Sequence, residues 1–345
     1  MKFRNIKIAA VSRLSLVLLV VILTACLPGP VSQPGNRNIT VYAFSIMKEA
    51  LERDIYPSFA AKWKREHGEE VTFSSSYAGS ETVTNQIIQG APADIAILSI
   101  EMDVKRMVAA GHVKEDWRAA PQLGIINKTA FVILVRPGNP HGIKDFRDLA
   151  KPGIKLIHPD PVSSGGAQWS ILSIYGAELI RSESETGEAD SEKAVETLRA
   201  IWANVISTPG SAREARTQFE TGYGDALITY ELEGILMKQA GTPVEMIVPP
   251  ATIMSEHPAV VIERGLTPSK REVAYAFRNY LWSEEAQKAF VRGNFRSVTS
   301  ETLNRSNPAL AEIEQPFDIR YFGGWERAYH DVIERIFGGK VKSSR

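Results

Sequence analysis

Residues 161–170 read PVSSGGAQWS and connect a predicted strand at 155–157 to a predicted helix at 166–181. Two serines and two glycines therefore stand where a helix begins. The first N–H groups of a helix have no partner within it, and they carry partial positive charge. Glycine lets a ligand approach the backbone closely, and a serine hydroxyl adds a rotatable donor. The stretch predicts a backbone opening that can hold an anion without a lysine or arginine.

Strand-to-helix units surround this stretch on both sides. In the first part of the chain, strands are predicted at 39–44, 70–75 and 94–99, and helices at 47–66, with a break at Pro57, at 81–89 and at 101–110. After a strong strand at 130–135, a second series begins. Its strands are predicted at 155–157, 204–207, 225–230 and 244–248, and its helices at 166–181, 211–221 and 231–240. The acidic stretch 182–192 is predicted to be a solvated surface loop, and 271–290 to be helical. This alternation predicts an α/β fold.

The two series predict two lobes, and 345 residues are enough for two. The chain is expected to cross between the lobes near 125–135 and again near 245–260. We expect residues 39–125 plus 255–345 to form lobe 1, and residues 126–254 to form lobe 2. Each lobe is predicted to hold a mainly parallel sheet flanked by helices. Ligands usually bind in the cleft between two such lobes, so the functional site is expected there.

Residues 1–25 have the pattern of a signal peptide. An apolar run at 14–25 follows four cations, Lys2, Arg4, Lys7 and Arg13. The run is too short to span a bilayer permanently. The run ends in LTAC, which resembles the bacterial lipobox, so Cys26, the only cysteine, is the predicted lipidation site. Residues 26–38 then form the lipidated cysteine and a flexible Pro/Gly tether. The mature protein is predicted to be extracytoplasmic and anchored to the membrane by acyl chains.

Charge and metal-ligand spacing exclude several classes of function. The chain carries 40 basic and 40 acidic residues, so losing the four leader cations leaves 36 against 40, a net charge of −4. Nucleic-acid binding is therefore not expected, because it needs a basic footprint. The six histidines are scattered without the spacing of a metal site, and no cofactor is expected.

A secreted serine hydrolase is the alternative outside the binding-protein class. SIMK at 45–48 has the S-x-x-K spacing of penicillin-interactive enzymes. The S-D-N and K-T-G motifs that accompany it there are missing, as is G-x-S-x-G. We therefore expect that the protein is not an enzyme.

Two further junctions share the composition of the first, YAFS at 42–45 and SYAGSE at 76–81. The stretch VRPGNPHGIKDFRDLAKPGIKLIHPDPVSSGGAQWSILSIYGAEL at 135–179 resembles the sulfate/thiosulfate-binding proteins of ABC importers. The resemblance continues through SAREARTQF and YGDALITYELE, LWSEEAQKAF at 281–290 and FGGWERAY at 322–329, and it covers essentially the whole mature chain. It implies a two-lobed, type II periplasmic binding protein that holds a dehydrated tetrahedral dianion by neutral hydrogen bonds.

The resemblance also implies an anion site. Carried over residue by residue, its members are Ser45, Ser80, Ser164, Gly165, Gly166, Ala212 and Tyr230. Ser164, Gly165 and Gly166 match the family's Ser-Gly-Gly donors. Ser45 stands where the family has an aspartate and Tyr230 where it has a tryptophan, and both replacements can still donate a hydrogen bond.

The identity of the anion stays open at this point. Sulfate or thiosulfate is the predicted ligand, but 71–97 resembles molybdate-binding proteins, whose serine and tyrosine donors also fit this chain. Molybdate or tungstate is therefore the alternative, and phosphate, for which Glu81 could act as an acceptor, is a weaker one. The expected partners are the permease subunits of an ABC importer, and the expected state is a monomer. Arg213 either reinforces the anion site or forms a salt bridge between the lobes.

Overall fold

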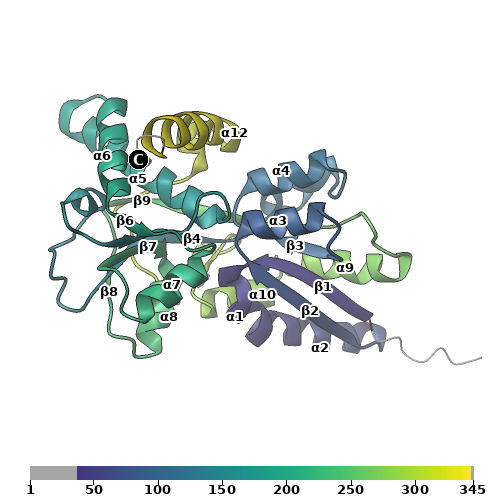
Figure 1. Ribbon diagram of the computed structural model, residues 1–345. Coiled ribbons are helices and arrows are strands. Elements are labelled where there is room, and N and C mark those ends of the chain that lie inside the picture. The colour runs from purple at the N-terminus through teal and green to yellow at the C-terminus, as the bar shows by residue number, and fades with distance from the viewer. Residues whose placement is uncertain (1–36, 343–345) are drawn as a thin grey trace, which may run out of the picture. The chain divides into compact units, whose positions relative to one another are not determined.

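The computed structural model describes residues 37–342 (Figure 1). The predicted signal peptide, Cys26 and tether residues 26–36 lie outside the described residues. None of the helices within 37–342 combines the length and apolar character that a membrane crossing requires.

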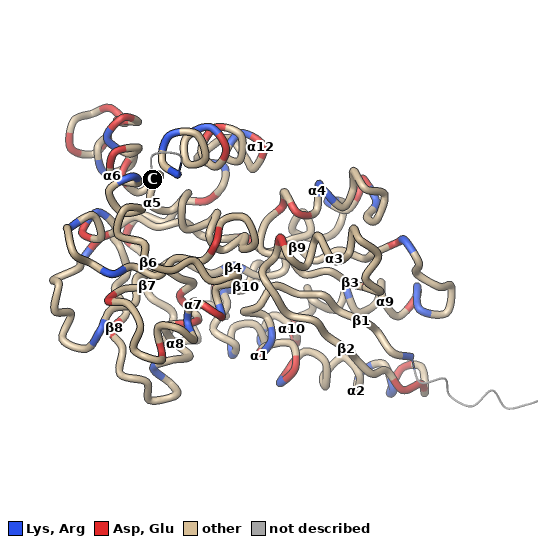
Figure 2. Tube along the Cα trace, viewed as in Figure 1, with Lys and Arg blue, Asp and Glu red and all other residues tan. Residues whose placement is uncertain are grey.

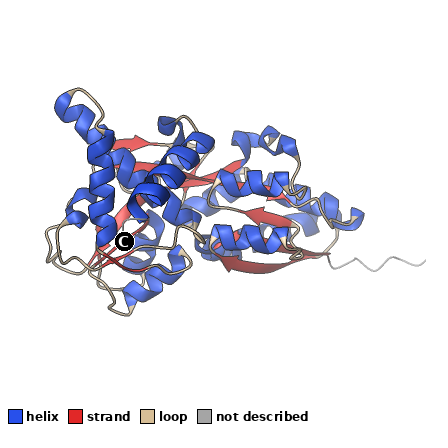
Figure 3. Cartoon of the chain, turned by 45° about the horizontal axis from the view of Figure 1, so that its top comes forward, coloured by secondary structure: helices blue, strands red, loops and turns tan. Residues whose placement is uncertain are grey.

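The first group of strands is parallel, as the βα alternation predicts. It consists of β1 (Arg37–Phe44), β2 (Val71–Ala78) and β3 (Ile95–Ile97), with β1 between the other two. The helices that cover this part of the sheet are α2 (Tyr56–His67), α3 (Ser80–Ile88), α4 (Glu101–Ala109) and α9 (Pro268–Tyr280). Ile39, Val41 and Ala43 of β1 are buried in one apolar cluster, and Tyr42, on the opposite face, packs partly buried against a second cluster, so helices cover both faces of the sheet (Figure 3).

The second group of strands has a parallel part and an antiparallel part. Its members are β5 (Leu156–Ile157), β6 (Val205–Ser207), β7 (Ala226–Tyr230) and β8 (Glu245–Ile247). β5 is parallel to both β6 and β7. The flanking helices are α5 (Gly165–Thr186), α6 (Ser191–Ala203), α7 (Ala212–Glu220) and α8 (Glu231–Gln239).

Two long antiparallel strands join these groups. β4 (Ile125–Val135) pairs with β9 (Ala251–Val261) along its first half and with β7 along its second half. The far end of β9 pairs with β3, which gives the strand order β2-β1-β3-β9-β4-β7-β5-β6. The short strands β10 (Arg296–Ser297) and β11 (Gln315–Phe317) add to β4 and β9. The predicted two-lobed α/β fold is confirmed, with antiparallel strands where the chain crosses.

Three local predictions are corrected. The acidic stretch 182–192 is not a loop throughout, because α5 continues to Thr186 and Asp190 caps the start of α6. The helical region 271–290 is two helices, α9 and α10 (Glu284–Arg292), and the Ser283 hydroxyl caps the second. Pro57 does not break the helical course of the chain, because the π-type segment at 51–55 continues directly into α2, and the proline, which has no backbone N–H, follows that segment.

Shorter helical segments complete the chain. They are 45–47, α1 (Lys48–Ala50), a π-type segment at 51–55, single turns at 115–119, 121–124, 146–150 and 319–322, and α11 (Glu301–Arg305). α12 (Trp325–Arg327) continues directly into a helical segment at 328–341.

This C-terminal helical segment lies against α5 and α6 (Figure 1). The rings of Trp169 and Trp325 are 4.5 Å apart, and those of Trp202 and Phe337 are 4.7 Å apart. The segment belongs to the stretch that the sequence assigned to lobe 1, yet it packs mainly against helices of lobe 2, with a smaller contact between α12 and α4 of lobe 1. The exact lobe boundaries stay predictions.

Candidate functional site

Strand ends from both lobes meet at the predicted anion site. Ser45 follows β1, Ser80 follows β2, and Tyr230 ends β7 directly before α8. Gly165 and Ala212 begin α5 and α7. The residues that precede the helices at 45, 80, 165 and 231 give no side-chain cap to these helix starts. Only the start of α7 is capped in this way, by the Ser211 hydroxyl. The group therefore combines several helix starts that receive no side-chain cap, although the Thr82 N–H of α3 donates to the Ser163 carbonyl at 3.4 Å.

The structure brings the seven predicted residues together, and all of them are buried. Ser45 of lobe 1 accepts a hydrogen bond from the backbone N–H of Arg213, next to Ala212 of lobe 2, at 3.4 Å. A Cβ atom placed on Gly166 would lie 2.8 Å from the Tyr230 hydroxyl. The lobes are thus in direct contact at the site.

Gly79 allows a close approach between the backbones of the two lobes. A Cβ atom on this residue would lie 2.2 Å from the carbonyl oxygen of Ser163 and 2.5 Å from that of Gly210. Both atoms belong to the backbone of lobe 2, and the Ser163 carbonyl also accepts from the Thr82 N–H at 3.4 Å. Only glycine permits this approach, which brings the start of α3 next to the start of α5.

Ser99 is a site residue that the sequence reasoning missed. Its hydroxyl lies 2.7 Å from the Tyr230 hydroxyl, and its N–H donates to Ser80 Oγ at 2.9 Å. Ser99 is the last residue of the strand predicted at 94–99, close to the helix predicted at 101–110. This place at a strand-to-helix junction was the available signal, as it was for Ser45.

A buried carboxylate lies behind Ser80. The Ser80 hydroxyl donates to Asp103, which has no exposed surface. Burial, together with the charge of Glu81, raises the pKa of Asp103 well above its ordinary value. Glu81 itself is buried, with 7% of its surface exposed. One Glu81 oxygen bonds Arg106, and the other accepts from Gln168 of lobe 2 at 3.0 Å.

Arg213 forms a salt bridge between the lobes. Its guanidinium bonds Glu49 of lobe 1 and, at 2.9 Å, Glu233 of lobe 2. Burial alone would raise the pKa of Glu49, but the Arg213 guanidinium holds it below its ordinary value. Because both carboxylates neutralise Arg213, the bridging role that the sequence favoured is the one observed.

Ser45 and Lys48, the S-x-x-K pair of the hydrolase alternative, have different hydrogen-bond and ion-pair partners. Lys48 forms an ion pair with Glu52 at 2.8 Å and lies 5.1 Å from the centre of the Tyr77 ring. Ser45 is bonded instead to the Arg213 N–H. His158 is buried, with its ring nitrogens beside the Pro159 carbonyl and the Ser170 hydroxyl.

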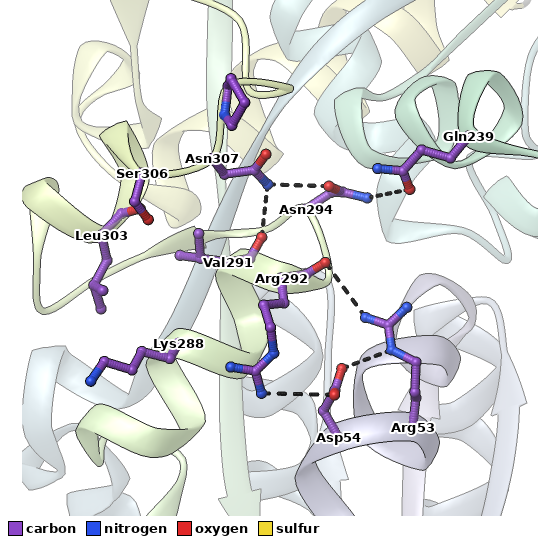
Figure 4. Close-up of a pocket in the computed structure, with 11 residues that line it drawn as sticks. Arg53, Asp54, Gln239, Lys288, Val291, Arg292, Asn294, Leu303, Ser306 and Asn307 are labelled. Carbon is purple, nitrogen blue, oxygen red and sulfur yellow. Dashed lines mark hydrogen bonds and ion pairs between the residues drawn. The ribbon is translucent and has the colours of Figure 1, made fainter.

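A separate pocket of about 660 Å³ lies beside α10 (Figure 4). Its cations are already paired with carboxylates, because Asp54 lies 2.9 Å from Arg53 and 3.7 Å from Arg292, and Lys288 is paired with Glu284. Over the described chain, lysines and arginines alternate with aspartates and glutamates and form no single basic face (Figure 2). Neither the pocket beside α10 nor the distribution of surface charge therefore indicates a dianion site in preference to the helix starts.

Two α/β lobes, joined by long crossing strands and touching at their strand ends, define the class of two-lobed, type II solute-binding proteins. The chain belongs to the bacterial extracellular solute-binding protein family, whose model matches residues 39–296.

Similar proteins fall within the same class. A sulfate-binding protein of Synechococcus elongatus is 34% identical over 84% of this chain and 81% of that protein. A thiosulfate-binding protein of Pseudomonas aeruginosa is 29% identical over 82% of this chain and 85% of its own length. The solved sulfate-binding protein SubI of Mycobacterium tuberculosis is 33% identical, with a TM-score of 0.76 over 85% of this chain and 98% of that one.

Proposed function

We propose that this protein captures sulfate or thiosulfate outside the cytoplasm and delivers it to the permease of an ABC importer. The observation that carries the proposal is the meeting of uncapped helix starts from both lobes at one buried group of serines, glycines and Tyr230. The names of the similar proteins support the choice of ligand.

The anion binds through neutral donors. Arg213, the nearest cation to this group, is already neutralised by two carboxylates. Backbone N–H groups and hydroxyls therefore hold the dianion, and each hydrogen bond to a charged group contributes about 1.5–3 kcal/mol. Donors from both lobes surround the anion only when the lobes are closed. The ligand thus stabilises the closed state by the contacts that it makes there alone.

Molybdate or tungstate is the second candidate ligand. Ser45, Ser80 and Tyr230 favour it, because the resemblance to molybdate-binding proteins implies serine and tyrosine donors, although the Ser80 hydrogen is donated to Asp103 in this structure. Phosphate is less favoured, because both oxygens of Glu81 are engaged by Arg106 and Gln168.

Calorimetric titration of the purified chain with sulfate, thiosulfate, molybdate, tungstate and phosphate separates these ligands. We expect the tightest binding for sulfate or thiosulfate. Tight molybdate binding without a response to either sulfur anion would contradict the proposed ligand. Steady turnover of an ester or β-lactam by the pure protein would contradict the binding-protein class itself.

We also propose that Cys26 carries the lipid anchor and that the soluble part acts as a monomer. Incorporation of labelled palmitate in a bacterial host tests the first point. A Cys26→Ser variant is expected to lose both the label and its place in the membrane fraction, while it keeps anion binding. Retention of the label would exclude Cys26 as the modified residue.

A further inference from the structure

Ser99 lies at the centre of the contacts between the lobes. It stands two residues after β3 and is 1% exposed. Its carbonyl accepts from the Trp169 indole N–H at 2.7 Å, and its hydroxyl lies 2.7 Å from that of Tyr230. Its N–H donates to Ser80 in its own lobe. Ser99 is therefore fixed on both sides of the interface, with only its hydroxyl able to rotate.

The Ser99 and Tyr230 hydroxyls have more hydrogens than their mutual bond uses. Each hydroxyl carries one hydrogen and accepting lone pairs, and the bond between them uses one of the two hydrogens. Burial raises the pKa of Tyr230 above its ordinary value, against the opposing effect of the bond from Ser99, so the phenol keeps its hydrogen. Whichever hydroxyl donates within the pair, the other retains a hydrogen for a third group.

The start of α5 lies directly beside this pair. A Cβ atom on Gly165 would lie 3.0 Å from Ser99 Oγ, and one on Gly166 would lie 2.8 Å from the Tyr230 hydroxyl. The first N–H groups of α5, which receive no side-chain cap, therefore stand next to the remaining hydroxyl hydrogen. An oxyanion at the start of α5 lies within reach of both kinds of donor.

We propose that Ser99 and Tyr230 act together as one donor to the bound oxyanion, which makes Ser99 a further anion-binding residue. The bond between the two hydroxyls joins the lobes, and the second hydrogen of the pair goes to the ligand. This inference rests on the proposed function, because it needs an oxyanion between the lobes. It implies redundancy: when one hydroxyl is removed, the other is released from the pair and supplies the donor.

A double-mutant cycle tests this redundancy. The variants Ser99→Ala, Tyr230→Phe and the double variant are titrated with sulfate, thiosulfate, molybdate and tungstate by calorimetry. Each single variant loses the bond between the lobes, so affinity falls by about 2- to 10-fold. The double variant also loses the donor to a charged ligand, so its affinity falls by roughly a further 10- to 100-fold beyond the product of the single losses.

A merely structural bond gives the opposite result. Either single variant would then remove the whole effect, and the double variant would be no weaker than the product of the single losses. That outcome overturns the inference and leaves the proposed function standing. If the wild-type chain bound none of the four anions, the proposed function and the inference would both be wrong.

The chain offers a matched control pair. Tyr56 and Ser75 also have their hydroxyls 2.8 Å apart, but both lie within lobe 1, on α2 and β2. The variants Tyr56→Phe and Ser75→Ala, alone and combined, are expected to leave anion affinity unchanged. Thermal unfolding without ligand checks that every variant is folded.

Discussion

Replacing Gly79 by alanine is expected to hold the lobes apart without harming either of them. The added Cβ would lie 2.2 Å from the Ser163 carbonyl oxygen and 2.5 Å from that of Gly210, so the backbones must separate by roughly 1 Å to restore an ordinary contact. Gly79 has φ of −62° and ψ of 146°, which alanine adopts without strain. Each lobe should therefore stay folded, and the free energy of unfolding without ligand should fall only through the weakened bonds between the lobes, such as the one between Ser99 and Tyr230.

Anion affinity should fall steeply in the same variant. Donors from the two lobes can no longer surround the ligand together, and the loss of two charge-assisted bonds costs about 3 kcal/mol or more, roughly 100-fold or more in affinity. Calorimetric titration with the preferred anion measures this loss. Gly339→Ala is the control, because its nearest neighbouring atom would lie 3.8 Å from the new Cβ. Binding by Gly79→Ala within threefold of wild type would refute the reasoning.

Three other substitutions probe the closed lobes and their core. Glu49→Gln weakens the salt bridge that Arg213 forms between the lobes. Because the Glu49–Arg213 pair is partly exposed, the anion affinity should fall only about 2- to 5-fold. The control Glu52→Gln should leave the affinity unchanged. His257 is buried, and burial lowers its pKa from 6.5 to about 3. Its folded form is therefore neutral, and the stability present above pH 6.5 is lost as the pH falls. By urea unfolding, the wild type should lose about 2 kcal/mol more than His257→Gln between pH 7 and pH 5, and an equal loss would contradict this origin. Trp325→Ala should lower the free energy of unfolding by about 3–5 kcal/mol, and a loss below 1 kcal/mol would show that the tail adds little.

Features encoded within a few neighbouring residues could be predicted from the sequence. The junctions at Ser45, Ser80 and Gly165 appeared as serine and glycine between an apolar strand and a helical pattern, and the structure has helix starts at all three. β9 was harder to predict, because Ser255, His257 and Pro258 interrupt its apolar pattern. The first two are buried among hydrogen bonds between β4 and β9, so their polarity does not indicate exposure.

Features that depend on distant partners could not be predicted. Ser99 contacts Tyr230 across 131 positions of sequence, and only the closed lobes bring the two together. The helix start at 191 was hidden because an acidic, polar stretch was interpreted as solvated, although it caps one helix and begins another. The C-terminal segment was assigned to lobe 1 with the rest of 255–345, because the pattern of its apolar residues does not show that Trp325 and Phe337 pack against Trp169 and Trp202.

The packing of that C-terminal segment sets an order on folding. Trp169 and Trp202 of lobe 2 are covered by residues that include Trp325 and Phe337, more than a hundred positions later in the chain. Lobe 2 therefore cannot complete its core while the chain is still being synthesised through the second half of lobe 1. Because α5 begins with the glycines of the predicted anion site, one turn before Trp169, we expect this site to reach its final form only after almost the entire polypeptide has been made.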